Sequence, residues 1–365
     1  EHASPHYLCT LPFATGAAPA AIDAERAWMP RLQVCAGEAL AYEPGDRAVI
    51  VAVVDTGVLL EHPELRPHLR RGRDMVRLEP HDLPAGIRLL ADDAVALTDL
   101  HDLVGHGTAC AGIIGATGEE IPPGLAGDCG LLPVKVLGSV LFPGKTEPIG
   151  VGAIADIDEG CKTAIDLGAK VLNMSFGTPA SALDPHDPLP HTDIVQYGLA
   201  RGCIMVAASG NSGRVEQMSP AALDGVIAVG AIGSDGRPTA FSTSGDHVAL
   251  CAPGERIVTA GLQGYAAVTG TSFAAPFVTA AVALLVSRAE GRAFALEGRA
   301  ARRILCDSAH PWPRGESFAG HGAGVLDAYA ALQALDQEID QQAIRDLSSR
   351  QGRSHSGGGS TNGTR

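Results

Sequence analysis

Short apolar runs alternate with amphipathic stretches along most of the chain. The runs are rich in β-branched residues, which is typical of buried strands. The predicted strands are residues 49–54, 131–137, 170–174, 203–207 and 226–229. Between two of them, Ile154, Ile157, Cys161 and Ile165 recur at intervals of three and four residues, so they share one face of a helix.

This alternation predicts an α/β fold of three layers, a mostly parallel, twisted sheet with helices on both faces. Parallel strands need long crossover connections, and helices supply them. In such sheets, functional groups gather where the strands end at their carboxyl side. Candidate chemistry is therefore sought directly after the predicted strands.

The length of 365 residues fits one domain with extensions at both ends. Residues 1–45 are predicted to form an N-terminal arm with a short helix near residues 21–29, and residues 46–340 the folded domain. Residues 341–365 run into Ser-Gly-Gly-Gly-Ser and are predicted to be a disordered tail. The apolar stretch 274–286 is too short to cross a bilayer, so it predicts a buried helix and no membrane span.

Composition narrows the choice of partners and cofactors. A formal net charge of −14 argues against nucleic acid as the main partner, because that binding depends on clustered lysine and arginine. The eight cysteines include no C-x-x-C pair, so the pattern suggests neither a zinc site nor a dense disulfide framework. Cys203 and Cys251 stand in apolar runs and are predicted to be buried thiols, whereas a Cys9–Cys35 pair stays open.

The first candidate for chemistry is Asp55, which ends a predicted strand and precedes Thr-Gly. A carboxylate at this place has three interpretations. It binds a nucleotide ribose, it caps the next helix, or it takes part in catalysis. Asp55 alone does not decide among them.

The segments around His106 and Ser272 favour the catalytic interpretation of Asp55. His106 lies in Gly-His-Gly-Thr-Ala-Cys-Ala-Gly at 105–112, where Cys110 occupies the place of the third glycine of a G-x-G-x-x-G dinucleotide loop, so the nucleotide interpretation fails. Ser272 lies in Gly-Thr-Ser-Phe-Ala-Ala-Pro and opens an apolar helix. An isolated serine there would be a helix cap. Together with a carboxylate and a histidine, it is better explained as a nucleophile whose oxyanion lies at a helix N-terminus.

These three segments, in the order Asp, His, Ser, resemble the signature motifs of the subtilisin-like serine peptidases, the subtilases. The resemblance covers about residues 45–335. It includes Asn-Met-Ser-Phe-Gly at 173–177, Ala-Ala-Ser-Gly-Asn at 207–211 and Gly-Ala-Gly-Val at 322–325. It implies that residues 46–340 form a subtilisin-like peptidase domain.

The resemblance also implies a mechanism, that of a serine endopeptidase working through an acyl-enzyme intermediate. Ser272 is the expected nucleophile, and His106 the general base and then the general acid. Asp55 is expected to orient His106 and to stabilise its charged form. Asn211 is expected to hold the oxyanion together with the Ser272 backbone N–H.

Further implications concern substrate. The family binds an extended protein or peptide between two backbone segments, here near Ser175, Phe176 and Gly177 and near residues 149–152. Met218 is expected to line the base of the first side-chain pocket. A narrow processing protease and a non-catalytic peptide-binding relative stay open as alternatives, whereas an α/β-hydrolase esterase would need G-x-S-x-G and another residue order.

Metals and compartment are less well determined. Family members often carry calcium, but Ala249 stands where many have a calcium-binding aspartate, and Glu64 stands at another such position. No cofactor or metal is therefore assigned, and calcium stays open. Family precedent favours secretion with a propeptide upstream, whereas many cysteines favour a reducing cytoplasm, so the compartment stays undetermined.

Overall fold

The computed structural model describes residues 8–10, 24–90, 100–184, 186–313 and 316–356. Its centre is a seven-stranded sheet in which all neighbouring strands are parallel. The five predicted strands all belong to it. In spatial order its strands are β13 (Val248–Pro253), β12 (Val226–Ile232), β10 (Ile204–Ala208), β8 (Ala169–Met174), β2 (Ile50–Asp55), β5 (Gly130–Lys135) and β3 (Arg73–Asp74).

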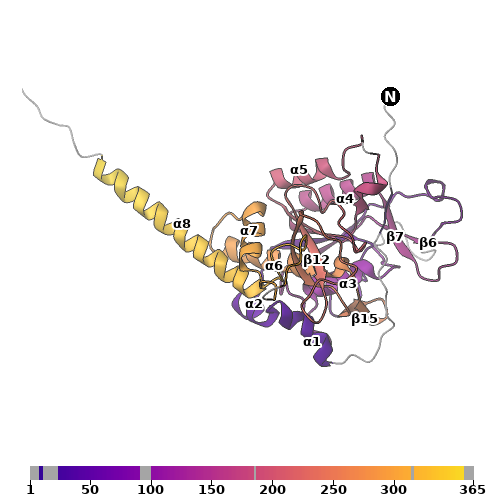
Figure 1. The fold of residues 1–365 in the computed structure, drawn as a ribbon, viewed down its shortest axis with the longest axis horizontal. Coiled ribbons are helices and arrows are strands. Elements are labelled where there is room, and N and C mark those ends of the chain that lie inside the picture. Colours follow the sequence, from indigo (N-terminus) through magenta and orange to yellow (C-terminus); the bar gives the residue numbers. More distant parts are fainter. Residues whose placement is uncertain (1–7, 11–23, 91–99, 185, 314–315, 357–365) are drawn as a thin grey trace, which may run out of the picture.

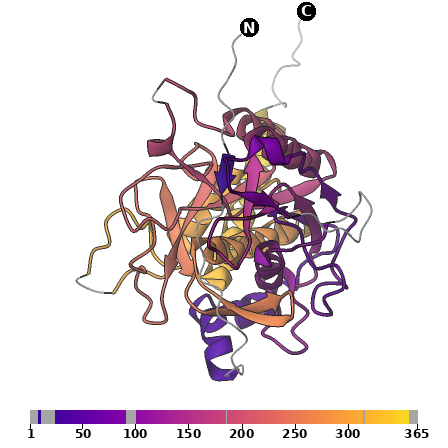
Figure 2. The ribbon, with the colours of Figure 1, turned by 90° about the vertical axis from the view of Figure 1, so that its right-hand side faces the viewer.

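Helices cover both faces of this sheet (Figures 1 and 2). Helices α3 (His106–Gly115) and α6 (Thr271–Gly291) pack on one face, and α4 (Ile154–Asp166) and α5 (Thr192–Ala200) on the other. Side chains alternate along a strand. Val51 and Val53 therefore point into the larger, first core under α3 and α6, and Ala52 and Val54 into the second core under α4 and α5. The predicted three-layer α/β fold is confirmed.

Helix α6 fills the centre of the larger core. Among the described helices it alone is long and apolar enough to cross a membrane, and 94% of the stretch that meets this test is buried inside the protein. It packs against β8, β10, β12 and α3, which gives its apolar surface protein partners all round. The buried helix predicted over 274–286 is therefore the core helix of the fold.

The N-terminal region is more ordered than the predicted arm. Within its described part, α1 (Ala24–Gln33) and α2 (Ala36–Tyr42) pack against the body of the protein. Arg31 of α1 is almost fully buried, donates to the Val258 carbonyl at 3.1 Å and lies over the Phe277 ring. These contacts tie α1 to the hairpin of β14 (Ile257–Gly261) and β15 (Gly264–Val268).

The remaining elements are small, apart from one long helix. A four-stranded antiparallel sheet has the order β1 (Leu8–Thr10), β7 (Ile149–Ala153), β6 (Gly138–Leu141) and β4 (Arg88–Leu89). Strands β9 (Thr178–Pro179) and β11 (Met218–Ser219) pair, and single turns of 3₁₀ helix cover Pro80–Asp82 and Ala180–Ala182. Helix α7 (Gly298–Ser308) packs on α8 (Ala328–Ser356).

Helix α8 replaces most of the predicted disordered tail. Residues 341–356 continue it beyond the body of the protein, while residues 357–365 lie outside the described part (Figure 1). Its first half is anchored by the pairs of Arg288 with Asp336 and Arg303 with Glu338. Once a helix is nucleated, each further residue adds a hydrogen bond at little free-energy cost, and the Gln, Ala, Ile and Leu residues here favour helix. The low-complexity end of the sequence hides this helical segment.

Candidate active site

Asp55 and His106 form a buried pair at the carboxyl edge of the sheet. Asp55 is the last residue of β2, and His106 is the first residue of α3. The His106 Nδ1 lies 2.8 Å from Asp55 Oδ1 and 3.0 Å from Oδ2. Burial opposes a charge on the imidazole, but the Asp55 carboxylate, together with Cys110, outweighs it, so the pKa of His106 lies well above its ordinary value.

Asp102, which the sequence interpretation missed, holds the loop that delivers His106. Its buried carboxylate accepts hydrogen bonds from the hydroxyl groups of Thr56 and Thr108, at 2.8 and 2.7 Å, and from the backbone N–H groups of 104, 105 and 108. Thr56 follows Asp55, so this one carboxylate fixes the Asp and His segments relative to each other. The one sequence feature that points to Asp102 is its position shortly before the Gly-His-Gly motif.

Ser272 lies in the first turn of α6, close to His106. The Ser272 hydroxyl donates to the Ser175 carbonyl at 3.1 Å, and the Ser175 hydroxyl donates to the Ser272 carbonyl at 2.7 Å. The next residue, Phe273, places its ring 5.0 Å from the imidazole of His106. Within the described residues, His106 Nε2 is buried and has no hydrogen-bond partner. Phe273 and Cys110, which both contact His106, thus place the Ser272 segment beside the Asp55–His106 pair, while the Ser272 hydroxyl is bound to Ser175.

Asn211 follows β10 and is bound to the residue before Ser272. Its Oδ1 accepts from the Thr271 backbone N–H at 2.9 Å and from the Thr271 hydroxyl at 2.8 Å. Because a backbone N–H can only donate, this contact fixes the amide so that Nδ2 is left as a donor. Gly270 leaves room for it, since a Cβ there would lie 3.1 Å from Nδ2.

The four predicted substrate residues lie together but differ in what they can offer. Ser175, Phe176 and Gly177 follow β8, and the Phe176 side chain is buried in the second core, with its ring 5.8 Å from that of His191. Phe176 can therefore meet a substrate only through its backbone. A Cβ at Gly177 would lie 3.2 Å from Met218 Cε, so the methionine fills the space beside that segment. Their roles in binding stay predictions.

A strand of the protein itself lies where an extended substrate was expected. Strand β1 pairs antiparallel with β7, with Cys9 opposite Gly152, and it also contacts β9. The Cys9 thiol lies beside Thr178 and Gly177, and burial raises its pKa to about 12. Residues 8–10 therefore lie between the two backbone segments predicted to bind a peptide.

The residues at the two expected calcium positions do not fit a calcium ion. The buried carboxylate of Glu64 accepts from the Thr117 hydroxyl at 2.7 Å and from the backbone N–H groups of 118, 119 and 120. Burial would raise the pKa of Glu64, but these hydrogen bonds outweigh it and lower the pKa. Ala249 is in the core and its carbonyl accepts from the Ala323 N–H. Glu64 thus holds the loop of residues 117–120 through hydrogen bonds.

All eight cysteines lie in described parts of the chain, and no disulfide joins any of them. Cys203 and Cys251 are buried thiols, as predicted. Cys9 and Cys35 belong to separate segments and do not form the pair that the sequence left open. Cys110 lies beneath the site, where its thiol donates to the Ser272 carbonyl at 3.4 Å.

The fold thus places a carboxylate, an imidazole and a hydroxyl group at the carboxyl edge of a parallel sheet in an α/β protein. The profile of the subtilase family matches residues 46–352, so the chain belongs to that family. The resemblance noted in the sequence is thereby confirmed, and the matches place the chain among the subtilisin-like serine peptidases.

Similarity to two bacterial serine proteases agrees with this assignment. The chain is 34% identical over 242 residues to the thermophilic serine proteinase of Bacillus sp. (strain AK1), a match to 65% of this chain and 52% of that protein. It is 33% identical over 246 residues to the intracellular serine protease of Paenibacillus polymyxa, 66% of this chain and 67% of that one. The alignments thus span about half to two thirds of these relatives' length.

A solved structure matches more of the fold. The prenylagaramide maturation protease PagA aligns with a TM-score of 0.65 and 26% identity, over 82% of this chain and 98% of that one. The likeness therefore extends over most of the fold described above.

Proposed function

We propose that the protein is a serine endopeptidase in which Ser272 is the nucleophile and His106 the base. One observation carries the proposal. The Asp55 carboxylate holds His106 Nδ1 at 2.8 Å, while the other ring nitrogen, Nε2, has no partner among the described residues. An imidazole bound in this way keeps its proton on Nδ1 and offers Nε2 as a base.

The reaction then proceeds in two halves. The Ser272 Oγ leaves its hydrogen bond to the Ser175 carbonyl, gives its proton to His106 Nε2 and attacks the peptide carbonyl. The imidazolium is stabilised by Asp55 and returns the proton to the leaving amine, so the peptide bond breaks and an ester to Ser272 remains. Water, with His106 again as base, hydrolyses this ester.

Asn211 supplies one of two donors to the oxyanion. Its Nδ2 is the free donor of an amide whose oxygen is engaged by Thr271, and the Ser272 backbone N–H at the start of α6 is the other. The negative oxygen forms only after attack. Both donors therefore act mainly on the transition state.

Replacing Asn211 with alanine is expected to lower kcat about 100- to 1,000-fold with little change in KM, because the lost hydrogen bond forms with the oxyanion and not with the bound peptide. Steady-state kinetics on a peptide amide measures both constants. A variant that raised KM and left kcat unchanged would assign Asn211 to substrate binding instead.

The substrate is a peptide in extended form. Strand addition gives affinity through main-chain hydrogen bonds, which the backbone around Ser175–Gly177 and β7 supplies. The position of β1 supports this mode, since an extended segment of the chain already pairs with β7 there. A narrow processing role is favoured by a second observation, the likeness to PagA, which is named as a maturation protease.

If β1 competes with substrate, a variant lacking residues 1–10 should have a KM about ten-fold lower than the full chain, with kcat unchanged, because a tethered strand has a high local concentration. A variant lacking residues 1–7 keeps β1 and is the matched control. Both are assayed on the same peptide amide. Equal KM values for the two truncations would show that β1 does not compete.

Incubation with casein and with a set of peptide amides tests the function itself, with cleavage sites identified by mass spectrometry. Many cleavage sites in casein would establish a general endopeptidase. Cleavage confined to a few related peptides would establish a processing enzyme. No cleavage by the folded protein, with or without residues 1–10, would leave a non-catalytic relative and overturn the proposal.

A further inference from the structure

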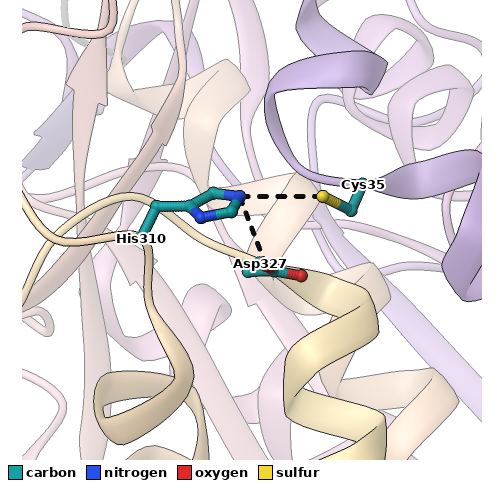
Figure 3. A group of neighbouring side chains, drawn as sticks. All are labelled: Cys35, His310 and Asp327. Atoms are coloured by element: carbon teal, nitrogen blue, oxygen red, sulfur yellow. Dashed lines mark hydrogen bonds and ion pairs between the residues drawn. The ribbon is translucent and has the colours of Figure 1, made fainter.

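Three side chains from distant segments meet near the start of α8 (Figure 3). Cys35 lies between α1 and α2, His310 follows α7, and Asp327 precedes α8. The His310 Nε2 lies 3.6 Å from Cys35 Sγ and 3.2 Å from Asp327 Oδ2, and all three donor atoms lie within 4.8 Å of one another. None of these residues belongs to the proposed peptidase site.

The arrangement differs from a proton relay. In a nucleophile–His–Asp relay the carboxylate and the nucleophile contact different ring nitrogens. Here both contact the same atom, Nε2, as the two dashed lines in Figure 3 show. A single ring nitrogen carries at most one proton, so it cannot serve the two partners equally well. Convergence of three donors on one point is instead the pattern of metal ligands.

The distances fit a tetrahedral zinc ion. With Zn–S of about 2.3 Å and Zn–N and Zn–O of about 2.0–2.1 Å, tetrahedral angles put sulfur and nitrogen about 3.6 Å apart and nitrogen and oxygen about 3.3–3.4 Å apart. The observed separations are 3.6 and 3.2 Å. Thiolate, imidazole and carboxylate are also the ligand types that zinc takes.

The backbone holds the three ligands in place. The backbone N–H groups of His310 and Val325 each donate to the other's carbonyl, at 2.8 and 2.9 Å, which fixes the histidine beside the segment that leads to Asp327. The second oxygen of Asp327, Oδ1, accepts from the Ala330 N–H at 2.8 Å, so Oδ2 is turned toward His310. Hydrogen bonding of a ligating carboxylate in this way orients metal ligands in known sites.

Cys35 itself is held at a backbone conformation that side chains seldom adopt. Its φ of 53° and ψ of 40° lie in the left-handed region, where glycine is favoured. Its thiol makes no cap hydrogen bond to α2. A cysteine kept at a glycine-like position, with its sulfur aimed at a histidine, points to a use for the sulfur.

We propose that Cys35, His310 and Asp327 bind one Zn²⁺ ion, with a water molecule as the fourth ligand. The His310 side chain is 49% exposed, which leaves the open position on the solvent side. The ion joins the turn between α1 and α2 to the start of α8. It therefore links the N-terminal helices to the C-terminal helix, outside the proposed peptidase site. The ligands are 275 and 17 residues apart, so no short cysteine–histidine spacing in the sequence indicates the site.

The test is a titration of chelator-treated full-length protein with Zn²⁺, followed by stoichiometry and unfolding temperature, and with Co²⁺ as a spectroscopic probe of thiolate ligation. One ion per chain, a thiolate-to-cobalt band and a higher unfolding temperature are expected. Cys35→Gly should lose all three and still fold, because glycine relieves the left-handed backbone. Its loss of affinity should exceed the roughly 10- to 100-fold cost of removing an outer-shell partner.

Two further variants complete the experiment. Cys306→Ser removes a partly exposed thiol outside the cluster and should bind zinc like the unaltered protein. His310→Ala should lose binding. The proposal is overturned if the unaltered protein takes up no zinc, or if Cys35→Gly retains the cobalt band. Retention would instead place the metal at Asp55, His106 and Cys110, the other described cluster of ligand atoms.

Discussion

Replacing Ser272 with alanine is expected to abolish peptide hydrolysis, with a fall in kcat on the order of 10⁶-fold, the size that the same change has in subtilisin. The reason is chemical, since the variant lacks the hydroxyl group that is proposed to give its proton to His106 Nε2 and form the ester. Hydrolysis of a peptide amide by the purified variant measures the loss. Its far-UV circular dichroism shows that the fold is kept.

The matched control for this variant lies on the same helix. Ser287 is also in α6, but its hydroxyl donates to Glu43 at 2.8 Å, away from the site. Ser287→Ala should keep kcat and KM within about two-fold and should lose about 1.5–3 kcal/mol of stability, the worth of a hydrogen bond to a charged group. If Ser272→Ala retained hydrolysis comparable with this control, another residue would have to be the nucleophile.

Replacing Asp55 with asparagine is expected to lower kcat about 10⁴-fold, because an amide can hold the wrong tautomer of His106 and cannot stabilise its charge. The variant should also change the pH profile. The base must be neutral, so kcat/KM falls as pH falls through the pKa of His106. Asp55 raises that pKa above its ordinary value of about 6.5, so the acid limb of the unaltered enzyme lies above that pH.

In the Asp55→Asn variant the limb should move to lower pH, since the negative charge that favours imidazolium is gone. The profile of kcat/KM from acid to alkaline pH, measured for both proteins, gives both midpoints. An acid limb that stayed at the same pH in the variant would mean that the titrating group is not His106, or that Asp55 does not act on it.

Much of the sheet could be predicted because most of its strands are continuous apolar runs in the sequence. Residues buried on both faces read as continuous β-branched runs, and the five predicted runs are β2, β5, β8, β10 and β12. Edge strand β3 is two residues long and has no comparable run. The polar second half of α8 predicts disorder from its composition, because local composition does not reveal that the first half is anchored by packing.

The residues of the site also differ in whether a local sequence pattern indicates them. Asp55, His106, Asn211 and Ser272 sit in contiguous motifs, so sequence indicated them directly. Asp102 was missed because its function is to accept hydrogen bonds from several segments, which no local pattern records. Likewise the motif around Phe176 predicts a substrate-binding segment, but only the fold reveals that the Phe176 ring belongs to the core.

The most direct test of the proposed catalytic arrangement is covalent labelling. The purified protein is treated with a fluorophosphonate, digested, and the modified residue is identified by tandem mass spectrometry, beside His106→Ala as the comparison. The account predicts one adduct, on Ser272, that is lost in His106→Ala and in the unfolded protein. Hydrolysis of peptide amides by a protein that carries no adduct on Ser272, or an adduct on another residue alone, would contradict it.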